Sequence, residues 1–358
     1  MAKPTKTIKK AKQPESKSVA AGELRQDLVT GKWVAIATGR AKRPHSFSRK
    51  DGRATDVPKY KDDCPFCNLA KYPQEPDVVR LPDDDEIWRV HIFGNKYPAF
   101  DAKEEFRSWQ QGPYRAMEAV GYHEVLATRD HNDADATMSL PDLTLQLEAL
   151  QIRYQELMTK PSVNYIQIMK NSGPEAGASL EHPHHQLFTT PVLPDDISDM
   201  LHGAEKYASE NNASPFTALI DFELESGERV VWENEQFVVF CPYASRTPFA
   251  LWIAPKKPNP FWQDISTDER LALSEALSQA MRRLAKGLNN PSYNYFINSA
   301  PCDDTGFVCN LESFQHFRWH IEILPRFGAL GGFEMVTGLE IVTALPEESA
   351  EFLREIDI

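Results

Sequence analysis

An internal repeat constrains the fold of this chain more than any other feature of its sequence. The segment Pro161–Ile166 (PSVNYI) recurs as Pro291–Phe296 (PSYNYF), 130 residues further on. Self-similarity at a fixed offset marks a repeated structural unit. The chain is therefore predicted to contain the same unit twice.

Each copy follows a helix-like segment and precedes a strand that carries histidine. Ser266 and Glu269 have the spacing of a capping box at the start of the second helix. The histidine-bearing strands are predicted at 182–188 and 319–324, and further strands at 88–92 and 237–241. Apolar residues at helical spacing form one face of each helix: Leu143, Leu147, Leu150, Tyr154 and Leu157 in the first copy, and Leu273, Leu277, Met281 and Leu284 in the second.

The predicted unit is thus strand, strand, helix, strand, strand. Hairpin strands with helices packed on the sheet give an antiparallel α+β fold with two repeated halves. We expect an N-terminal half at 23–194, a linker at 195–230 and a C-terminal half at 231–358. Residues 1–22 are rich in lysine and poor in large apolar residues, so we expect a disordered basic tail there.

The charge balance excludes some classes of protein. The 358 residues include 39 basic and 52 acidic ones, and the net charge of −13 disfavours a general nucleic-acid binder. The sequence contains no run of 18 apolar residues, so no membrane span is expected. Five cysteines, an odd number, do not resemble a disulfide framework. We therefore expect a protein of the reducing cytoplasm.

A CxxC turn, Cys64-Pro65-Phe66-Cys67, is the first candidate site. Two thiolates at this spacing can bind one tetrahedral Zn²⁺. The alternative redox motif needs a neighbouring βαβ pattern, which the sequence does not show, and a pair of unremarkable cysteines is the other alternative. The remaining cysteines lie far along the chain, so the other two zinc ligands are expected to be histidines.

The densest group of chemically active residues is His182-Pro183-His184-His185-Gln186. On a strand, His182, His184 and Gln186 share one face and His185 points to the other. The alternative is a solvated strand with chance histidines. The preceding loop, 171–179, is rich in small residues, so its backbone amides can approach an anion closely. Together these segments suggest phosphate chemistry on an imidazole.

This set of motifs resembles the galactose-1-phosphate uridylyltransferase branch of the histidine-triad superfamily and the related ADP-glucose phosphorylases. The resemblance covers most of residues 23–350. The motifs that carry it are Arg40-Ala41-Lys42-Arg43-Pro44, Cys64-Pro65-Phe66-Cys67, Asn95, Asn171-x-Gly173, Gly177-x-Ser179, His182-x-His184-x-Gln186 and Gly331-Gly332-Phe333-Glu334.

The resemblance implies that His184 is a nucleophile that attacks the α-phosphorus of a nucleotide sugar. A nucleotidyl-histidine then forms, and the kinetics are expected to be ping-pong. Gln186 stands where histidine-triad hydrolases have a third histidine, and it favours a transferase because a phosphate leaving group needs no proton. His185 replaces a small residue of the family, and we expect a surface histidine there.

The resemblance also implies one structural zinc, bound by Cys64, Cys67, His131 and His182. His123 is a rival for His131, but it would lie inside a strand at 122–128. A second metal of some family members is not expected, because Met200 and Glu322 stand where the family has ligands.

The residues that match nucleotide- and phosphate-binding positions are Arg40, Arg43, Asn95, Asn171, Gly177, Ser179 and Gln186, and those that match sugar-contacting positions are Phe333 and Glu334. The resemblance thus implies a homodimer that moves UMP between UDP-glucose and a hexose 1-phosphate. An ADP-sugar phosphorylase is the alternative, since Gly328 replaces an expected lysine. The third possibility is a non-catalytic, zinc-stabilised nucleotide-binding protein.

Overall fold

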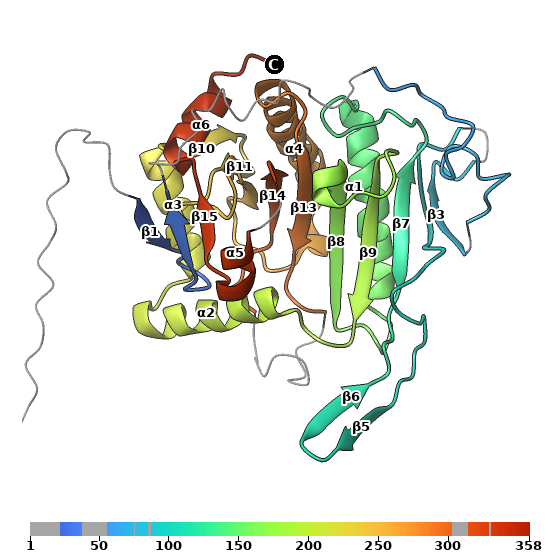
Figure 1. The fold of residues 1–358 in the computed structure, drawn as a ribbon, viewed down its shortest axis with the longest axis horizontal. Helices are drawn as coiled ribbons and strands as arrows, with labels where there is room; N and C mark the ends of the chain where they lie inside the picture. Colours follow the sequence, from blue (N-terminus) through green and yellow to red (C-terminus); the bar gives the residue numbers. More distant parts are fainter. Residues whose placement is uncertain (1–21, 38–55, 75, 85–86, 303–313, 329–330) are drawn as a thin grey trace, which may run out of the picture.

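A ten-stranded sheet crosses the molecule (Figure 1). The computed structural model describes residues 22–37, 56–74, 76–84, 87–302, 314–328 and 331–358; within them the strand order is β10-β11-β12-β14-β13-β8-β9-β7-β4-β3, with every neighbouring pair antiparallel. The strands are β3 (Asp77–Leu81), β4 (Val90–Gly94), β7 (His123–Thr128), β8 (Tyr165–Ser172), β9 (His184–Thr190), β10 (Val230–Glu233), β11 (Phe237–Phe240), β12 (Leu251–Pro255), β13 (Ser292–Asn298) and β14 (His320–Arg326).

The sheet is built from two halves with the same strand order. From either outer edge the order is first strand, second, third, fifth, fourth, and the two fourth strands, β8 and β13, pair at the centre. The repeated segments found in the sequence form these two central strands. The predicted α+β fold with two repeated halves is confirmed.

Each half contains one strand more than the predicted unit, because three strands and not two precede its helix. The strand predicted at 122–128 is β7, whereas β12 was not predicted. Leu251–Pro255 is buried along its whole length, so its residues are apolar on both faces of the sheet. Such a strand lacks the alternation that identifies a half-exposed strand in a sequence.

Two long helices, α1 (Leu140–Leu157) and α4 (Thr267–Gly287), cover one face of the sheet and contact each other. The apolar faces predicted for both helices are buried in one core with residues of the strands. The predicted capping box is present, since Ser266 and Glu269 each accept a hydrogen bond from the backbone N–H of the other.

On the opposite face of the sheet, two helices cover the C-terminal half. Residues 195–230, predicted as a linker, contain α2 (Asp195–Asn211) and α3 (Pro215–Ser226), which pack on the C-terminal half in a second core. The remaining elements are β1 (Glu23–Gln26), β2 (Trp33–Ile36) and β15 (Glu340–Val342) in a small sheet, the hairpin of β5 (Ser108–Gln111) and β6 (Tyr114–Met117), the short helices α5 (Gly332–Thr337) and α6 (Pro346–Arg354), and the 3₁₀ turns η3 (Pro174–Ala176) and η4 (Trp262–Asp264).

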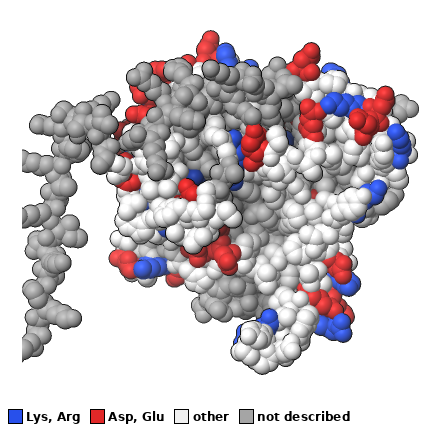
Figure 2. All heavy atoms as spheres, in the orientation of Figure 1, with Lys and Arg blue, Asp and Glu red and all other residues white. Residues whose placement is uncertain are grey.

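Acidic and basic side chains are mixed over the face of the molecule shown in Figure 2. None of the helices in the described ranges is long and apolar enough to cross a membrane. The predicted basic tail, residues 1–22, lies almost entirely outside the described residues.

The packing of α4 gives a first testable prediction. Leu273 is fully buried under the sheet, whereas Leu271 on the same helix is 49% exposed. Leu273→Ala is expected to lower the free energy of unfolding by about 2–5 kcal/mol, because it leaves a cavity. The matched control Leu271→Ala should change it by less than about 0.5 kcal/mol. Denaturant unfolding measures both values, and equal effects would contradict the orientation of α4.

Candidate functional site

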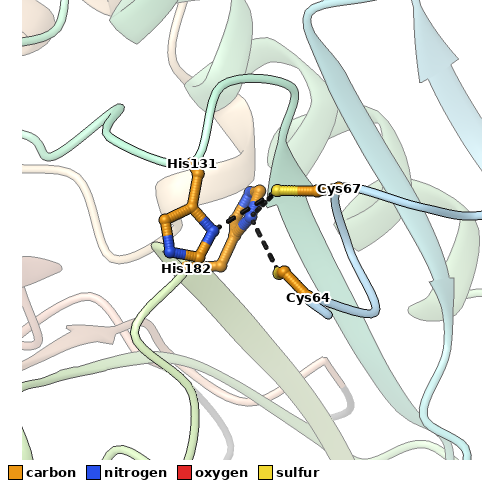
Figure 3. Close-up of side chains that lie close together, drawn as sticks. All are labelled: Cys64, Cys67, His131 and His182. Atoms are coloured by element: carbon orange, nitrogen blue, oxygen red, sulfur yellow. Dashed lines mark hydrogen bonds between the residues drawn. The ribbon is translucent and has the colours of Figure 1, made fainter. Parts of the chain in front are cut away.

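Four predicted metal ligands converge where strand β7 ends and strand β9 begins (Figure 3). Cys64 and Cys67 come from a turn before β3, His131 follows β7, and His182 precedes β9. Their ligand atoms all lie within 4.8 Å of one another. His123 and His131 are the two histidines that the sequence offers for the fourth ligand position. The structure places His131, not His123, in this cluster.

The spacing of the ligand atoms fits a tetrahedral zinc ion. Zinc bonds of about 2.3 Å to sulfur and about 2.0 Å to nitrogen, at tetrahedral angles, place such atoms about 3.5 Å apart. The Sγ of Cys67 lies 3.3 Å from Nδ1 of His131 and 3.5 Å from Nδ1 of His182, and the Sγ of Cys64 lies 3.5 Å from the latter atom. The cluster is consistent with a structural zinc site.

In both His131 and His182, a contact at Nε2 leaves Nδ1 facing the middle of the cluster. The Nε2–H of His182 donates to the carbonyl of Thr128 (2.8 Å), and Nε2 of His131 lies 3.5 Å from a carboxylate oxygen of Glu181. Both Nδ1 lone pairs are therefore free to bind a metal, as the hydrogen-bond partners at the other ring nitrogen of zinc-bound histidines usually ensure. Burial lowers the pKa of His182 to about 4, so its ring is neutral, and burial raises the pKa of the Cys67 thiol to about 11.

The predicted nucleophile, His184, opens strand β9 two residues after the zinc ligand. Its Nδ1–H donates to the carbonyl of His182 (2.8 Å), which fixes the neutral tautomer with a lone pair on Nε2. The ring is 7% exposed and touches the ring of Phe66, with 5.4 Å between centroids. Burial lowers the pKa of His184. The arrangement therefore presents a neutral, oriented imidazole whose Nε2 can attack an electrophile.

Gln186 lies on the same face of β9, with two further polar side chains beside it. Its Oε1 is 3.1 Å from Nε2 of His123 on β7, and the amide nitrogen of Asn95 is 3.0 Å from the same ring nitrogen. The sequence suggests His123 only as a possible zinc ligand. Its place beside Gln186 comes from the strand register, in which His123 pairs with Phe188 on β9.

The small-residue loop lies beside the zinc ligands. Gly173 (φ 87°) and Gly177 (φ 79°) flank η3 and adopt backbone angles that favour glycine. Asn171 and Ser179 border a cavity of about 600 Å³ that also contacts His131 and His182. The structure thus brings two of the predicted phosphate-binding residues to one opening. Arg40 and Arg43 lie outside the described residues.

The expectation that His185 is a surface histidine is wrong. His185 is fully buried, and its Nε2 bonds the hydroxyl of Tyr295 on β13. A buried ion pair between Lys170 and Asp135 (2.7 Å) lies nearby, and Tyr293 donates to the same carboxylate (2.9 Å). The prediction failed because the face of β9 opposite His184 is not solvated: it packs on the side of the sheet that α1 and α4 cover.

The C-terminal half carries a histidine at the position that corresponds to His184. His320 opens β14, and its Nδ1 bonds the carbonyl of Arg318 (3.1 Å). Its Nε2, however, lies 3.2 Å from the amide of Asn298, and its ring stacks on Trp252 with 4.1 Å between centroids. His320 is 1% exposed, so its Nε2 is not available to a substrate.

The predicted sugar-contacting residues lie elsewhere. Phe333 and Glu334 are on α5, and Glu334 borders a cavity of about 320 Å³ with Arg246, Met200 and Glu322 of β14. Strands β13 and β8 separate β14 from β9, which amounts to about 14 Å at the usual spacing of strands. The structure therefore does not bring Phe333 and Glu334 to His184 of the same chain.

This chain is similar to a known protein family and to several characterised relatives. Residues 11–194 match the family described as galactose-1-phosphate uridyl transferase, N-terminal domain. ADP-glucose phosphorylase of Arabidopsis thaliana is 31% identical over 94% of this chain and 93% of its own length, and galactose-1-phosphate uridylyltransferase of Thermotoga maritima is 29% identical over 94% and 99%. The crystal structure of the Arabidopsis ADP-glucose phosphorylase with bound ADP-glucose aligns with a TM-score of 0.79, at 29% identity, over 94% of this chain and 100% of that one.

The geometry of the cluster predicts one zinc ion per chain whose loss destabilises the fold. Cys64→Ser and His131→Ala are expected to lower the zinc content and the thermal unfolding midpoint together, because metal binding is coupled to folding. His123→Phe should keep its zinc. Metal analysis with thermal unfolding tests this, and full zinc in His131→Ala would remove His131 from the site.

Proposed function

This chain belongs to the galactose-1-phosphate uridylyltransferase family of nucleotidyltransferases, and we propose that its nucleotide carrier is Nε2 of His184. The observation that carries this proposal is the hydrogen bond from Nδ1 of His184 to the carbonyl of His182. It holds the proton on one ring nitrogen and leaves the lone pair on the other. His320 does not offer the same atom, which supports His184 as the nucleophile of the pair.

The proposed reaction has two steps at the α-phosphorus. Nε2 of His184 forms a bond to that phosphorus, and the bond to the bridging oxygen breaks, so a sugar 1-phosphate leaves with the electron pair. An oxygen of a second phosphate group then attacks the same phosphorus, and the bond to Nε2 breaks. The histidine returns to its starting state, which gives ping-pong kinetics.

Gln186 supports transfer rather than hydrolysis. Its neutral amide can donate hydrogen bonds to the phosphoryl oxygens as charge develops on them. It cannot protonate a leaving group, and both the leaving group and the acceptor of the proposed reaction are phosphates that need no proton.

We propose ADP-glucose as the nucleotide donor and inorganic phosphate as the acceptor. The likeness to the plant ADP-glucose phosphorylase over almost the whole chain supports this pair, as does the segment Gly331–Glu334. The absence of the expected lysine, with Gly328 in its place, is also in its favour. The second candidate pair is UDP-glucose with galactose 1-phosphate, which the matched family and the Thermotoga relative support.

The zinc ion that Cys64, Cys67, His131 and His182 would hold has a structural role in this proposal. Four protein ligands close its coordination shell, so no position is open to a substrate. The ion would fix the backbone of His182, whose carbonyl orients His184.

We propose that the working form is a homodimer. The support comes from α5, where Phe333 is 52% exposed and Met335 and Val336 are 74% and 87% exposed. Exposed apolar residues on one short helix suit an interface. A second copy would cover them and could bring Phe333 and Glu334 to the partner's His184.

The nucleophile assignment predicts that His184→Ala abolishes turnover, with a loss of roughly 10⁴-fold or more, because the covalent carrier is gone. Donor binding should persist. The control His202→Ala alters an exposed histidine of α2 and should retain wild-type activity. A panel of ADP-glucose and UDP-glucose, each with phosphate or galactose 1-phosphate, measures turnover and identifies the substrate pair. Substantial activity in His184→Ala would disprove the assignment.

Gln186→His is expected to shift the reaction towards hydrolysis. The new imidazole, with an ordinary pKa of about 6.5, can exchange protons on the strand face where Gln186 cannot. Release of nucleoside monophosphate from the donor without an acceptor should rise relative to transfer. An unchanged ratio would show that Gln186 does not decide between the two reactions.

A further inference from the structure

We infer that His123 is a positioning residue that fixes the orientation of the Gln186 amide, so that the amide oxygen faces His123 and the NH₂ group faces the substrate. This inference rests on the proposed function, because it assigns Gln186 a phosphoryl group to bind. The two side chains lie on adjacent strands, β7 and β9, and on the same face of the sheet as His184. The geometry fixes the direction of their hydrogen bond.

The tautomer of His123 follows from a contact with the backbone. Nδ1 of His123 lies 3.1 Å from the backbone nitrogen of Ala99, whose N–H points at it. A backbone N–H is always a donor, so Nδ1 must be the acceptor and carry no proton. In the neutral ring the proton is then on Nε2, and Nε2–H needs an acceptor.

Gln186 supplies that acceptor. Its Oε1 is 3.1 Å from Nε2 of His123. The Asn95 amide nitrogen also lies 3.0 Å from Nε2 and is a donor. A neutral ring could accept from it at Nε2 only with its own proton on Nδ1, and the Ala99 N–H at Nδ1 excludes that tautomer. The oxygen of Asn95 already accepts the backbone N–H of Tyr97 (2.9 Å), which holds the Asn95 amide in this orientation. Among these neighbours, the Nε2 proton can only go to Gln186.

The ring of His123 is held in place by aromatic packing. It stacks on Phe188 with 3.9 Å between centroids and 25° between planes, and Phe100 packs edge-on against Phe188. Burial favours the uncharged form of His123, and its pKa is lowered. A ring that is stacked on one side and bonded at Nδ1 can orient a flexible side chain such as glutamine.

The consequence is a preset direction for the two N–H groups of Gln186. With Oε1 bonded to His123, the NH₂ group points away from β7, on the face of β9 that carries His184. An amide free to turn would present its oxygen to the phosphoryl group about as often, and an oxygen there would repel the developing negative charge. The hydrogen bond from His123 removes that unproductive orientation.

A double-mutant cycle tests this relationship. The variants are His123→Phe, which keeps an aromatic ring on Phe188 but removes the donor, Gln186→Ala, and the two together. The readout is the single-turnover rate at which sugar 1-phosphate is released from ADP-glucose or UDP-glucose, with donor affinity measured separately. His123→Phe should slow this step by about 10- to 100-fold, a loss in the range of an outer positioning partner, while donor affinity stays within about twofold of wild type.

The two changes should not add. In the Gln186→Ala background, His123→Phe is expected to have almost no further effect, because His123 acts through Gln186. His123→Gln, which can still donate a hydrogen bond, should recover part of the rate. Equal effects of His123→Phe with and without Gln186 would overturn the inference and give His123 a merely structural role.

The tautomer supplies a measurement that needs no activity. Nitrogen NMR of the wild-type protein should show a neutral His123 ring with its proton on Nε2, and a proton on Nδ1 would overturn the inference. If the protein transfers no nucleotide from any donor, the proposed function fails, and the NMR result still decides how His123 and Gln186 are bonded.

Discussion

The hydrogen bond from Nδ1 of His184 to the carbonyl of His182 is the interaction on which the site depends. The same residue, His182, turns its Nδ1 to the Cys64–Cys67–His131 cluster, and its Nε2–H donates a hydrogen bond to the carbonyl of Thr128. His182 therefore connects the candidate zinc cluster, the end of strand β7 and the tautomer of the proposed nucleophile. In the proposed function, a zinc ion held there would take no direct part in the chemistry and would act by fixing a backbone carbonyl.

The duplicated sheet gives a physical reason why, in the proposed function, only one half carries the chemistry. Both halves begin their fifth strand with a histidine whose Nδ1 bonds a carbonyl two residues earlier. In the C-terminal half, Trp252 and Asn298 close off the imidazole, and buried Glu322 occupies the position of Gln186. The pairing of β8 with β13 joins the halves. The hydrogen bond between His185 and Tyr295 links them on the face of the sheet opposite His184. In the proposed function the second half thus supplies packing behind the first half and no second nucleophile.

Much of this organisation could be predicted from the sequence, and the failures have physical reasons. The repeat gave the two halves, and the alternation of side chains on a strand gave the shared face of His182, His184 and Gln186. The same argument failed for His185, because alternation tells which face a residue takes but not whether a helix covers that face. Strand β12 was missed since residues buried on both sides do not alternate. The contact between His123 and Gln186 depends on strand register, which a single sequence does not specify.

The central claim is that the nucleotide is carried on His184, and a direct test is to trap the intermediate. Wild-type protein is mixed with ADP-glucose or UDP-glucose without acceptor, quenched under alkaline conditions that preserve a phosphoramidate, and analysed by mass spectrometry. The account predicts a mass increase of one nucleoside monophosphate group, located on the peptide at His184, which disappears when an acceptor phosphate is added. An unmodified protein that still turns over both substrates, or a nucleotide on another residue such as His320, would contradict it.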